Sequence, residues 1–556
     1  MKKKMLWLFT LLIVSVVALA GCYGGEKAGS DADEKDETKG TSEESTGPSV
    51  LHLAVAGEIP TLKTNGQMDG LSQTILQNIY EGLFKIDQND QVIEGIVDTY
   101  DVSEDGKTYT FHLKETVWSN DTPVTANDFV YAWKKNLHPE TISPHAYLMG
   151  PVKNAAAIQD PESDLYGKVD ELGVKVIDEK TLEVELDNTV PYITELLAHQ
   201  VFYPQNEEFV ESQGDQYALE PENIISNGAF TIDTWAHDQS WTLKKNPKYW
   251  NADTVKLDEV NYKVAKDTAT EMNLYETDTI DVANLSSEFV DVYKDHEEYT
   301  TSLKSEIYFL RMNQKNPNLA NANIRKAIDM GWDKEQAADA ILKNGSQAAY
   351  WLVFPGFVET PEGGDFRDKF GDLNKGTVEE AQALWTKGLE ELGVDEISLE
   401  LLSYDDDQRK SIAEYMKNQL EKNLPGLKIT INQQPNKQKL ALEDALDYDI
   451  SHSGWRNDIA DPVEFLSVFL SDGPYNWQNF KNDRFDELVK KAMVDFSDNN
   501  QRAIDLQEAE EILIAQEAAI SPMYQAGSAR LVKPHVKGFV THANSTFSFQ
   551  WVTIEK

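Results

Sequence analysis

The chain contains almost no cysteine. Among its 556 residues there is a single one, Cys22. One thiol cannot form an internal disulfide, a CxxC redox pair or a cysteine zinc site. Stability must therefore come from a buried core. A folded body of roughly 500 residues is long enough to supply one and to divide into two to four domains.

Basic side chains are also scarce. The chain has 51 Lys and Arg residues against 95 Asp and Glu residues, which gives a formal charge of −44. A polyanion lacks the basic patch that displaces counterions from nucleic acid, and anionic lipid repels it. We therefore expect no nucleic-acid partner, and attachment to a membrane would need a covalent tether.

Signatures of catalysis and cofactor binding are missing as well. The sequence has no GxSxG, HExxH or GxGxxG pattern, and its Gly-Lys-Thr at residues 106–108 has Asp101 where a phosphate loop needs glycine. The acidic run at residues 405–407 lacks the spacing of a calcium loop. We expect no enzymatic activity, no cofactor and no metal site.

The N-terminus has the pattern of a secretory signal. Three lysines at residues 2–4 precede an apolar run, residues 5–20, that is short for a membrane span. The run closes in Leu19-Ala20-Gly21-Cys22, which resembles the lipobox of bacterial lipoproteins, whose cysteine is acylated and becomes the first residue. We expect residues 1–21 to be a signal peptide. The resemblance implies that lipid on Cys22 holds the chain on the extracytoplasmic face of the cell membrane of a Gram-positive bacterium.

Residues 22–49 are expected to be a disordered linker that starts at the lipid anchor. After the cysteine they are rich in Gly, Ser, Asp and Glu and nearly free of apolar residues, so they cannot bury enough surface to fold. Globular patterning begins at residues 50–55, where alternation predicts a strand, and continues to Ile554.

Strand and helix signals mix throughout the folded body. Alternating residues predict hairpins after the turn pair Asp105-Gly106 and around the polar turn at residues 178–180. Thr125 with Asp128 predicts the start of a helix. Further helices are expected at residues 324–330, 378–392, 408–423 and 502–516, with short strands at residues 399–402 and 427–431. Helices that alternate with strands indicate an α/β protein with a parallel sheet.

Five strings, in order, carry a resemblance to a known family. They are VWSNDTPVTANDFVYAW (residues 117–133), SNGAF (226–230), LKKNPKYW (243–250), IRKAI (324–328) and ARLVKP (529–534). In them the chain resembles the oligopeptide- and dipeptide-binding lipoproteins of ABC importers, solute-binding protein family 5, over almost all of its folded length. The usual Asp-Gly of the first string is Asn120-Asp121 here. Taken as residues alone, these strings are mostly turns and core aromatics that touch no ligand.

The resemblance implies a fold and its division. The fold would be α/β and two-lobed, periplasmic-binding-protein-like, of the type II, large three-domain variant that closes by hinge motion. Domain I would be discontinuous, with residues 50–70, 193–303 and 526–556. Domain II would span residues 71–192, and domain III residues 304–525.

A sixth string places the expected ligand site. Residues 453–462, SGWRNDIADP, match the family segment in which a strand pairs with bound peptide and an aspartate receives the peptide's α-ammonium group. That aspartate is Asp458 here. A buried ammonium needs an opposing charge with lone pairs, which supports this role, and an exposed loop acid is the alternative. Asp461, which precedes Pro462, is expected to be a turn or cap residue.

By the same resemblance, the peptide backbone would be held by β-augmentation. One side would be formed by Gly454, Trp455, Arg456 and Asn457, and the other by residues 56–61, including Glu58, Ile59, Pro60 and Thr61. Pro60 has no N–H to donate, so one ladder bond is absent there or is made elsewhere. Tyr147 resembles a pocket-lining tyrosine of the family, and an ordinary buried tyrosine is its alternative.

The departures from the family concern the C-terminal end of the peptide. Relatives place cationic side chains there, and two of these positions are His452 and Glu443 here. Lys343 and Arg409 fall at comparable places, with solvated surface charge as the alternative reading. The leucine-aspartate after the first strand is replaced by Leu62-Lys63. Longer peptides, including signalling peptides, therefore become candidate ligands.

The expected function is that of a monomeric, lipid-anchored receptor. It would bind oligopeptides and present them to the permease and ATPase subunits of an ABC importer. Two alternatives stay open. The same fold could bind another solute, such as a nickel complex, heme or a sugar, or the chain could be a hydrolase of surface peptides or glycans.

Overall fold

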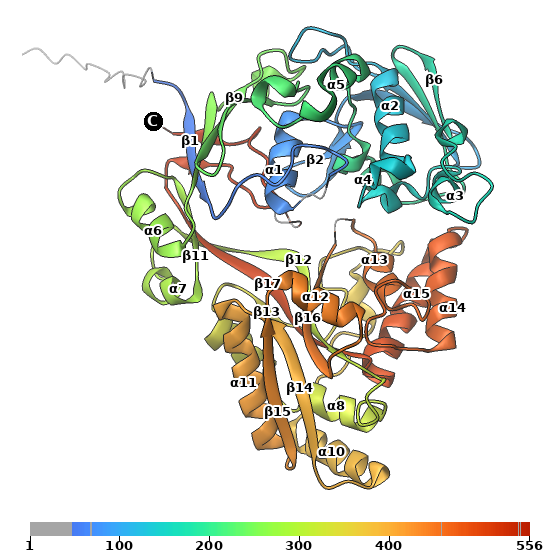
Figure 1. Ribbon diagram of the computed structural model, residues 1–556, viewed down its shortest axis with the longest axis vertical. Coiled ribbons are helices and arrows are strands. Elements are labelled where there is room, and N and C mark those ends of the chain that lie inside the picture. The colour runs from blue at the N-terminus through green and yellow to red at the C-terminus, as the bar shows by residue number, and fades with distance from the viewer. Residues whose placement is uncertain (1–46, 67–68, 458, 543, 545, 556) are drawn as a thin grey trace, which may run out of the picture. The chain divides into compact units, whose positions relative to one another are not determined.

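The computed structural model describes residues 47–556, except residues 67–68, 458, 543, 545 and 556. The described residues belong to one compact unit, Gly47–Lys556. Within this unit two lobes are joined by long strands (Figure 1). We call residues 47–303 and 526–555 the upper lobe, and residues 304–525 the lower lobe. No helix of the described part of the chain is both long and apolar enough to cross a membrane.

The first sheet of the upper lobe has four strands in the order β1-β10-β9-β8. β1 pairs with β10 in parallel, and the other pairs are antiparallel. Leu51, Leu53, Trp241 and Tyr262 alternate with more exposed neighbours and are at most 5% exposed, so one face of the sheet closes the core. The strands are β1 (Val50–Val55), β8 (Phe230–Ala236), β9 (Ser240–Lys245) and β10 (Glu259–Val264).

A second antiparallel sheet of the upper lobe has the order β4-β5-β7-β6 and contains both predicted hairpins. Gly106 closes the first turn with φ 68°, a value that glycine reaches without strain. The strands are β4 (Val97–Val102), β5 (Thr108–Leu113), β6 (Val174–Asp178) and β7 (Thr181–Glu185), and β2 (Phe84–Ile86) pairs separately with β3 (Val92–Glu94).

Helices cover these sheets, and α2 begins as the sequence predicts. The Thr125 N–H donates to the Asp128 carboxylate at 2.8 Å, and Trp133 is fully buried with its indole N–H on the Phe202 carbonyl. The upper-lobe helices are α1 (Gly70–Ile79), α2 (Ala126–Leu137), α3 (Ala155–Gln159), α4 (Ile193–Leu197), α5 (Glu207–Gln213), α6 (Thr268–Glu276) and α7 (Ser287–Tyr293).

Two long antiparallel strands, β12 (Tyr299–Met312) and β17 (Ile520–Val532), run from one lobe into the other (Figure 1). Their register shifts between Leu303 and Ile307, where Leu303 pairs with Gly527 and Ile307 pairs with Gln525. Irregular pairing twists and bends a sheet locally. The predicted domain boundaries at residues 303/304 and 525/526 fall at this irregularity, and the domain division itself stays a prediction.

β12 and β17 belong to a seven-stranded sheet that extends over both lobes, with the order β11-β17-β12-β16-β14-β15 and with β13 paired to β17. Its strand β11 lies in the upper lobe, and β13, β14, β15 and β16 lie in the lower lobe. The expectation of a parallel sheet holds only in part, because β14 is parallel to β15 and β16 whereas the remaining pairs are antiparallel. The strands are β11 (Val282–Leu285), β13 (Gln347–Ala348), β14 (Ile397–Tyr404), β15 (Leu427–Gln434) and β16 (Ile450–Arg456). Two short strands, β18 (Val536–Lys537) and β19 (Thr553–Ile554), pair in the C-terminal segment.

The lower-lobe helices follow the predicted segments closely. α10 has the predicted bounds because Thr377 caps its first turn and Gly393, at φ 69°, ends it. The last predicted helix begins earlier, at Asn499, and its final turn over residues 512–516 is a π-helix. The helices are α8 (Ala322–Met330), α9 (Lys334–Gln336), α10 (Val378–Leu392), α11 (Asp407–Asn423), α12 (Asn436–Asp444), α13 (Pro462–Leu466), α14 (Asp483–Val494) and α15 (Asn499–Glu511).

Candidate functional site

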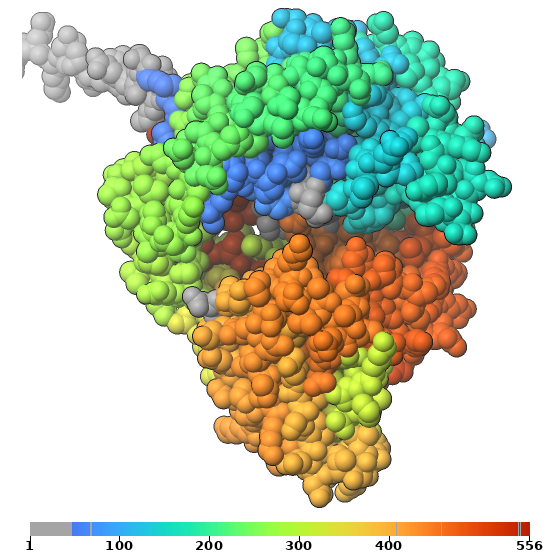
Figure 2. Space-filling view, in the orientation of Figure 1, coloured from blue at the N-terminus to red at the C-terminus, as the bar shows by residue number. Residues whose placement is uncertain are grey.

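The strand expected to hold a peptide backbone is β16, and it has one open edge. Along its whole length it pairs with β12, from Glu306 opposite Arg456 to Met312 opposite Ile450. On its other side β14 pairs only with Ile450 and Ser451. Among the described residues, the rest of that edge has no strand partner. Figure 2 shows the surface hollowed between the α1 region and the lower lobe, beside this sheet.

The open edge presents backbone groups of Gly454 and Arg456. The Asn457 N–H donates to the Ser305 carbonyl at 2.9 Å, which continues the ladder with β12. In an antiparallel ladder alternate residues face the partner strand, so the N–H and C=O of Gly454 and Arg456 turn to the open side. Gly454 cannot be larger, because a Cβ there would lie 2.8 Å from the Tyr308 ring.

The two predicted sides of the site meet at the first turn of α1. The Arg456 guanidinium donates to the Gln73 side-chain oxygen at 3.1 Å, and the Thr61 N–H donates to the neighbouring Ser72 hydroxyl at 3.3 Å. Segments almost 400 residues apart are thereby brought to one helix end, where they contact two consecutive residues. Trp455 turns to the other face of β16 and packs edge-on against Tyr475, 5.2 Å between ring centroids.

The 58–61 segment is irregular chain rather than a strand. Glu58 is held inside the upper lobe, since it accepts the Trp235 indole N–H at 2.6 Å and the Asp238 N–H. Ile59 is 3% exposed and belongs to the core, whereas Pro60 is exposed. The segment can therefore offer a peptide isolated backbone contacts but no continuous ladder.

His452 lies at the far end of β16 and is fully buried. Burial lowers its pKa well below the usual value, and the charges of Arg409 and Lys439 lower it further. Three tyrosine rings, Tyr308, Tyr404 and Tyr524, surround it at 5.5 to 6.1 Å. His452 is thus a neutral side chain within an aromatic group, which we call the aromatic end of the site.

The other two cations predicted for this end, Arg409 and Lys343, have partners inside the protein. Arg409 stacks on Tyr308 and Tyr404, at 5.0 and 4.6 Å from the ring centroids, and donates to Asp406 at 2.9 Å. Arg409 also lines a small polar cavity with Lys304 and Glu306. Lys343 pairs with Asp291 at 2.5 Å, and Tyr147 is 59% exposed.

Glu443, the second departure from the family, makes its contacts within a buried network of polar side chains. Its carboxylate accepts the Lys439 ammonium at 2.7 Å and the Ser451 and Ser453 hydroxyls, and the Arg311 guanidinium lies 4.0 Å away. Both Lys439 and Glu443 are at most 1% exposed. Burial lowers the pKa of Lys439 to about 8 although Glu443 opposes the shift. Among the described residues, the Lys439–Glu443 pair therefore leaves no unpaired charge of its own for a peptide terminus.

Asp458 and Cys22 lie outside the described residues, whereas the residues directly before and after Asp458 are described. Asn457 is 2% exposed, and neither atom of its amide has a hydrogen-bond partner within the described part of the chain. Ile459 joins the upper-lobe core. Asp461 is a cap, as predicted, and accepts the Val463 N–H at the start of α13. Both of its oxygens also accept from Arg502, at 2.8 and 2.9 Å.

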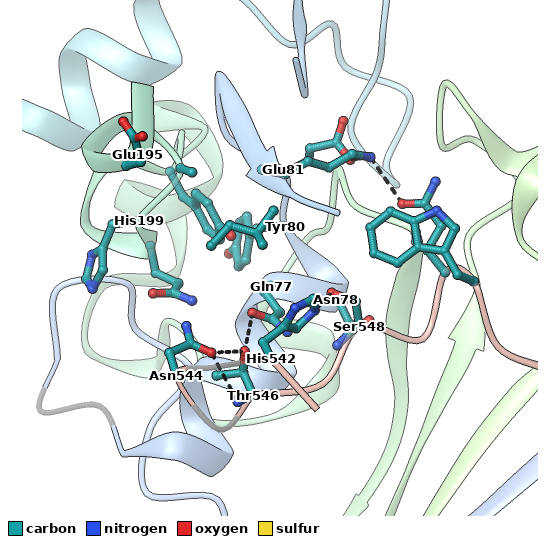
Figure 3. Close-up of a pocket in the computed structure, with 18 residues that line it drawn as sticks. Gln77, Asn78, Tyr80, Glu81, Glu195, His199, His542, Asn544, Thr546 and Ser548 are labelled. Carbon is teal, nitrogen blue, oxygen red and sulfur yellow. Dashed lines mark hydrogen bonds and ion pairs between the residues drawn. The ribbon is translucent and has the colours of Figure 1, made fainter. Parts of the chain in front are cut away.

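A polar cavity lies inside the upper lobe, where α1, α4 and the C-terminal segment meet. Figure 3 shows Glu195 and His199 above a group formed by Gln77, Asn544 and Thr546. The Thr546 hydroxyl lies 3.0 Å from the Gln77 carbonyl oxygen and 2.7 Å from that of Asn544. Amides and hydroxyls dominate this lining. Among the described residues no cluster of His, Cys, Asp and Glu has the geometry of a metal site.

Three features of this site were not predicted from the sequence. The tyrosines at the aromatic end come from β12, β14 and β17, the Lys439–Glu443 pair comes from α12, and Arg502 comes from α15. The i,i+4 spacing of Lys439 and Glu443 is the one local signal that could have been used.

Comparisons with known proteins agree with this geometry. A sequence model of the bacterial extracellular solute-binding proteins, family 5 Middle, matches residues 91–477. The chain is 31% identical over 550 residues to the dipeptide-binding protein DppE of Bacillus subtilis (strain 168), with 99% of this chain and 98% of that protein covered. The substrate-binding domain of an oligopeptide ABC transporter from Bacillus anthracis str. Ames has a TM-score of 0.78 at 41% identity, over 91% of this chain and 99% of that chain. The pheromone receptor PrgZ, solved to define its mode of peptide binding, has a TM-score of 0.78 at 33% identity, over 92% and 100%.

Proposed function

This chain belongs to family 5 of the bacterial extracellular solute-binding proteins, and from that premise we propose that it is a receptor for oligopeptides. It binds them in extended form between its two lobes and delivers them to an ABC importer. The matched oligopeptide, dipeptide and pheromone binders support this ligand class, and they include a signalling peptide among the candidates.

The observation that carries the proposal is the open edge of β16 beside the 58–61 segment. Gly454 and Arg456 turn their N–H and C=O groups to that edge, and Arg456 reaches the same α1 turn that holds Thr61. An extended peptide completes such an edge with main-chain hydrogen bonds, which are indifferent to side-chain identity. Asp458, which follows Asn457, is the proposed acceptor of the peptide's α-ammonium group.

Membership of the family places the chain outside the cytoplasm. We further propose that lipid on Cys22 anchors it to the membrane of a Gram-positive bacterium and that it acts as a monomer. A random coil of 27 residues, the number between Cys22 and Val50, has a reach of roughly 25 to 30 Å, and such a tether would keep the receptor close to the permease and ATPase subunits. It carries peptide without transforming it, so no enzymatic step is proposed.

The decisive experiment compares one pentapeptide with its N-acetylated twin on the full chain purified in detergent. Acetylation removes the positive charge that Asp458 would bind, and loss of one member of a buried charged pair costs about 2–5 kcal/mol. We expect the acetylated peptide to bind about 100-fold more weakly in calorimetry. Equal affinities would refute the ammonium site.

Two further measurements address the alternatives. Native mass spectrometry of the purified chain should show a ladder of peptide masses, whereas a metal complex, heme or sugar in their place would favour another solute. Recovery of intact peptide after long incubation with the protein would contradict hydrolysis. Cleavage products would contradict the assignment as a receptor.

A further inference from the structure

A cavity of about 200 Å³ lies between the lobes near Asp461, at the opposite end of β16 from His452. The upper lobe contributes Tyr192 and Glu195 from the start of α4, and the lower lobe contributes Val358 and Leu506. Tyr192 packs on Phe496 of the lower lobe, 6.3 Å between ring centroids, so this is a place where the lobes touch. The cavity has a mixed lining, apolar on its walls and charged at a few points.

The position of the cavity relates it to the proposed ammonium site. Ala460, Asp461 and Pro462 line it, and they follow Asp458 by two to four residues. The bidentate contact of Asp461 with Arg502 fixes that stretch of chain. The proposed ammonium site is therefore close in sequence to residues that line this cavity.

The charges that remain at the cavity are negative. Arg502, the cation in its lining, is satisfied by Asp461 and by the Ala492 carbonyl at 2.7 Å. The Glu195 carboxylate accepts only from the hydroxyl of its neighbour Thr194, at 3.2 Å, and no cation of the described residues pairs with it. Glu359 adds a second carboxylate, on exposed chain.

Glu195 lines two cavities. It lines the inter-lobe cavity and the amide-rich cavity of the upper lobe, where Figure 3 shows it at the end away from Asn544 and Thr546. A side chain that enters between the lobes would meet the apolar groups of this lining and the Glu195 carboxylate. A cavity of about 150 Å³ holds benzene, so this volume admits the four methylenes of lysine.

We propose that this cavity receives the first side chain of the bound peptide and that Glu195 makes it select lysine or arginine. A long basic side chain matches the lining, since its stem is apolar and its tip is a cation. This inference rests on the proposed function, because it takes the peptide's N-terminus to be at Asp458. It adds a residue preference that backbone recognition alone cannot produce.

The test compares two pentapeptides, Lys-Ala-Ala-Ala-Ala and norleucine-Ala-Ala-Ala-Ala, by calorimetry on the full chain. Norleucine keeps the stem of lysine and lacks the ammonium group. A charge-assisted hydrogen bond contributes about 1.5–3 kcal/mol, so the wild-type chain should bind the lysine peptide roughly 10- to 100-fold more tightly. Glu195→Gln should bring the two affinities together without weakening the norleucine peptide.

The matched control is Glu208→Gln, which makes the same charge change at an exposed position of the same lobe. It should leave the preference for lysine unchanged, because the inference attributes that preference to local contact with Glu195. A preference caused by the overall charge of −44 would respond equally to both substitutions. Equal binding of both peptides by the wild type overturns the inference, as does a preference that survives in Glu195→Gln. If neither peptide binds the wild type, the proposed function itself fails.

Discussion

The two ends of β16 handle charge in opposite ways. At the aromatic end the Glu443 carboxylate takes up Lys439, and the neighbouring His452 is neutral. At the other end Asp461 is satisfied by Arg502, but Glu195 has no cation among the described residues. At the aromatic end the Glu443 carboxylate is paired, whereas at the other end the Glu195 carboxylate has no ion-pair partner among the described residues.

This contrast indicates where the protein discriminates among peptides. An unpaired carboxylate gains a charge-assisted bond when a cation arrives, whereas a paired one must first give up the partner it has. Selectivity should therefore be concentrated at the N-terminal end of the peptide. The aromatic end would tolerate different lengths and C-termini.

The largest effect on stability is expected for Glu443→Gln, which removes the buried carboxylate at the aromatic end. The substitution leaves Lys439 and Arg311 buried without their shared carboxylate, and an uncompensated buried charge costs about 3–5 kcal/mol. Lys439 should then lose its proton, because burial already lowers its pKa to about 8 in the presence of Glu443. Urea unfolding followed by tryptophan fluorescence should show a clearly lower midpoint.

Lys439→Met is the matched control for Glu443→Gln. It leaves Glu443 with Arg311 at 4.0 Å and with the Ser451 and Ser453 hydroxyls, so the loss should be smaller, about 1–2 kcal/mol. The double variant Lys439→Met with Glu443→Gln should be more stable than Glu443→Gln alone. If Lys439→Met proves the more harmful single change, the charges at this end are not arranged as described.

A smaller effect concerns pH and the neutral His452. A base with a lower pKa in the folded state binds fewer protons there, so its contribution to stability is lost as pH falls below the unfolded value near 6.5. Between pH 6.5 and 5 the wild type should lose up to about 2 kcal/mol more than His452→Gln, at about 1.4 kcal/mol per pH unit. Urea midpoints of both proteins at several pH values measure this, and parallel pH profiles would contradict it.

Much of the fold could be predicted because local signals agree with it. The capping residues Thr125 and Thr377 start their helices where the sequence places them, and Gly393 ends α10. The sheet of the lower lobe was predicted less well. β12 and β17 pair across more than 200 residues in antiparallel fashion, and such pairing is set by tertiary contacts rather than by any local pattern.

The site divides in the same way. Resemblance of a short string was sufficient to predict the cap at Asp461 and the strand that carries Gly454. It could not show that His452 is enclosed by tyrosines, because those rings come from three other strands. Nor could it distinguish Glu195 from the other acidic residues of the chain, since the distinction is its place in the inter-lobe cavity without an ion-pair partner among the described residues.

The smallest effect should follow a change at the peptide's other terminus. C-terminal amidation removes one negative charge from a peptide, yet Arg409 is already paired with Asp406, and Lys304 has Glu306 beside it. A pentapeptide and its amide should therefore bind within about threefold of each other, less than 1 kcal/mol, in the calorimetric assay used for N-acetylation. A loss of tenfold or more on amidation would mean that Lys304 or Arg409 receives the carboxylate. Both ends of the site would then discriminate among peptides by charge, which would contradict the difference proposed between them.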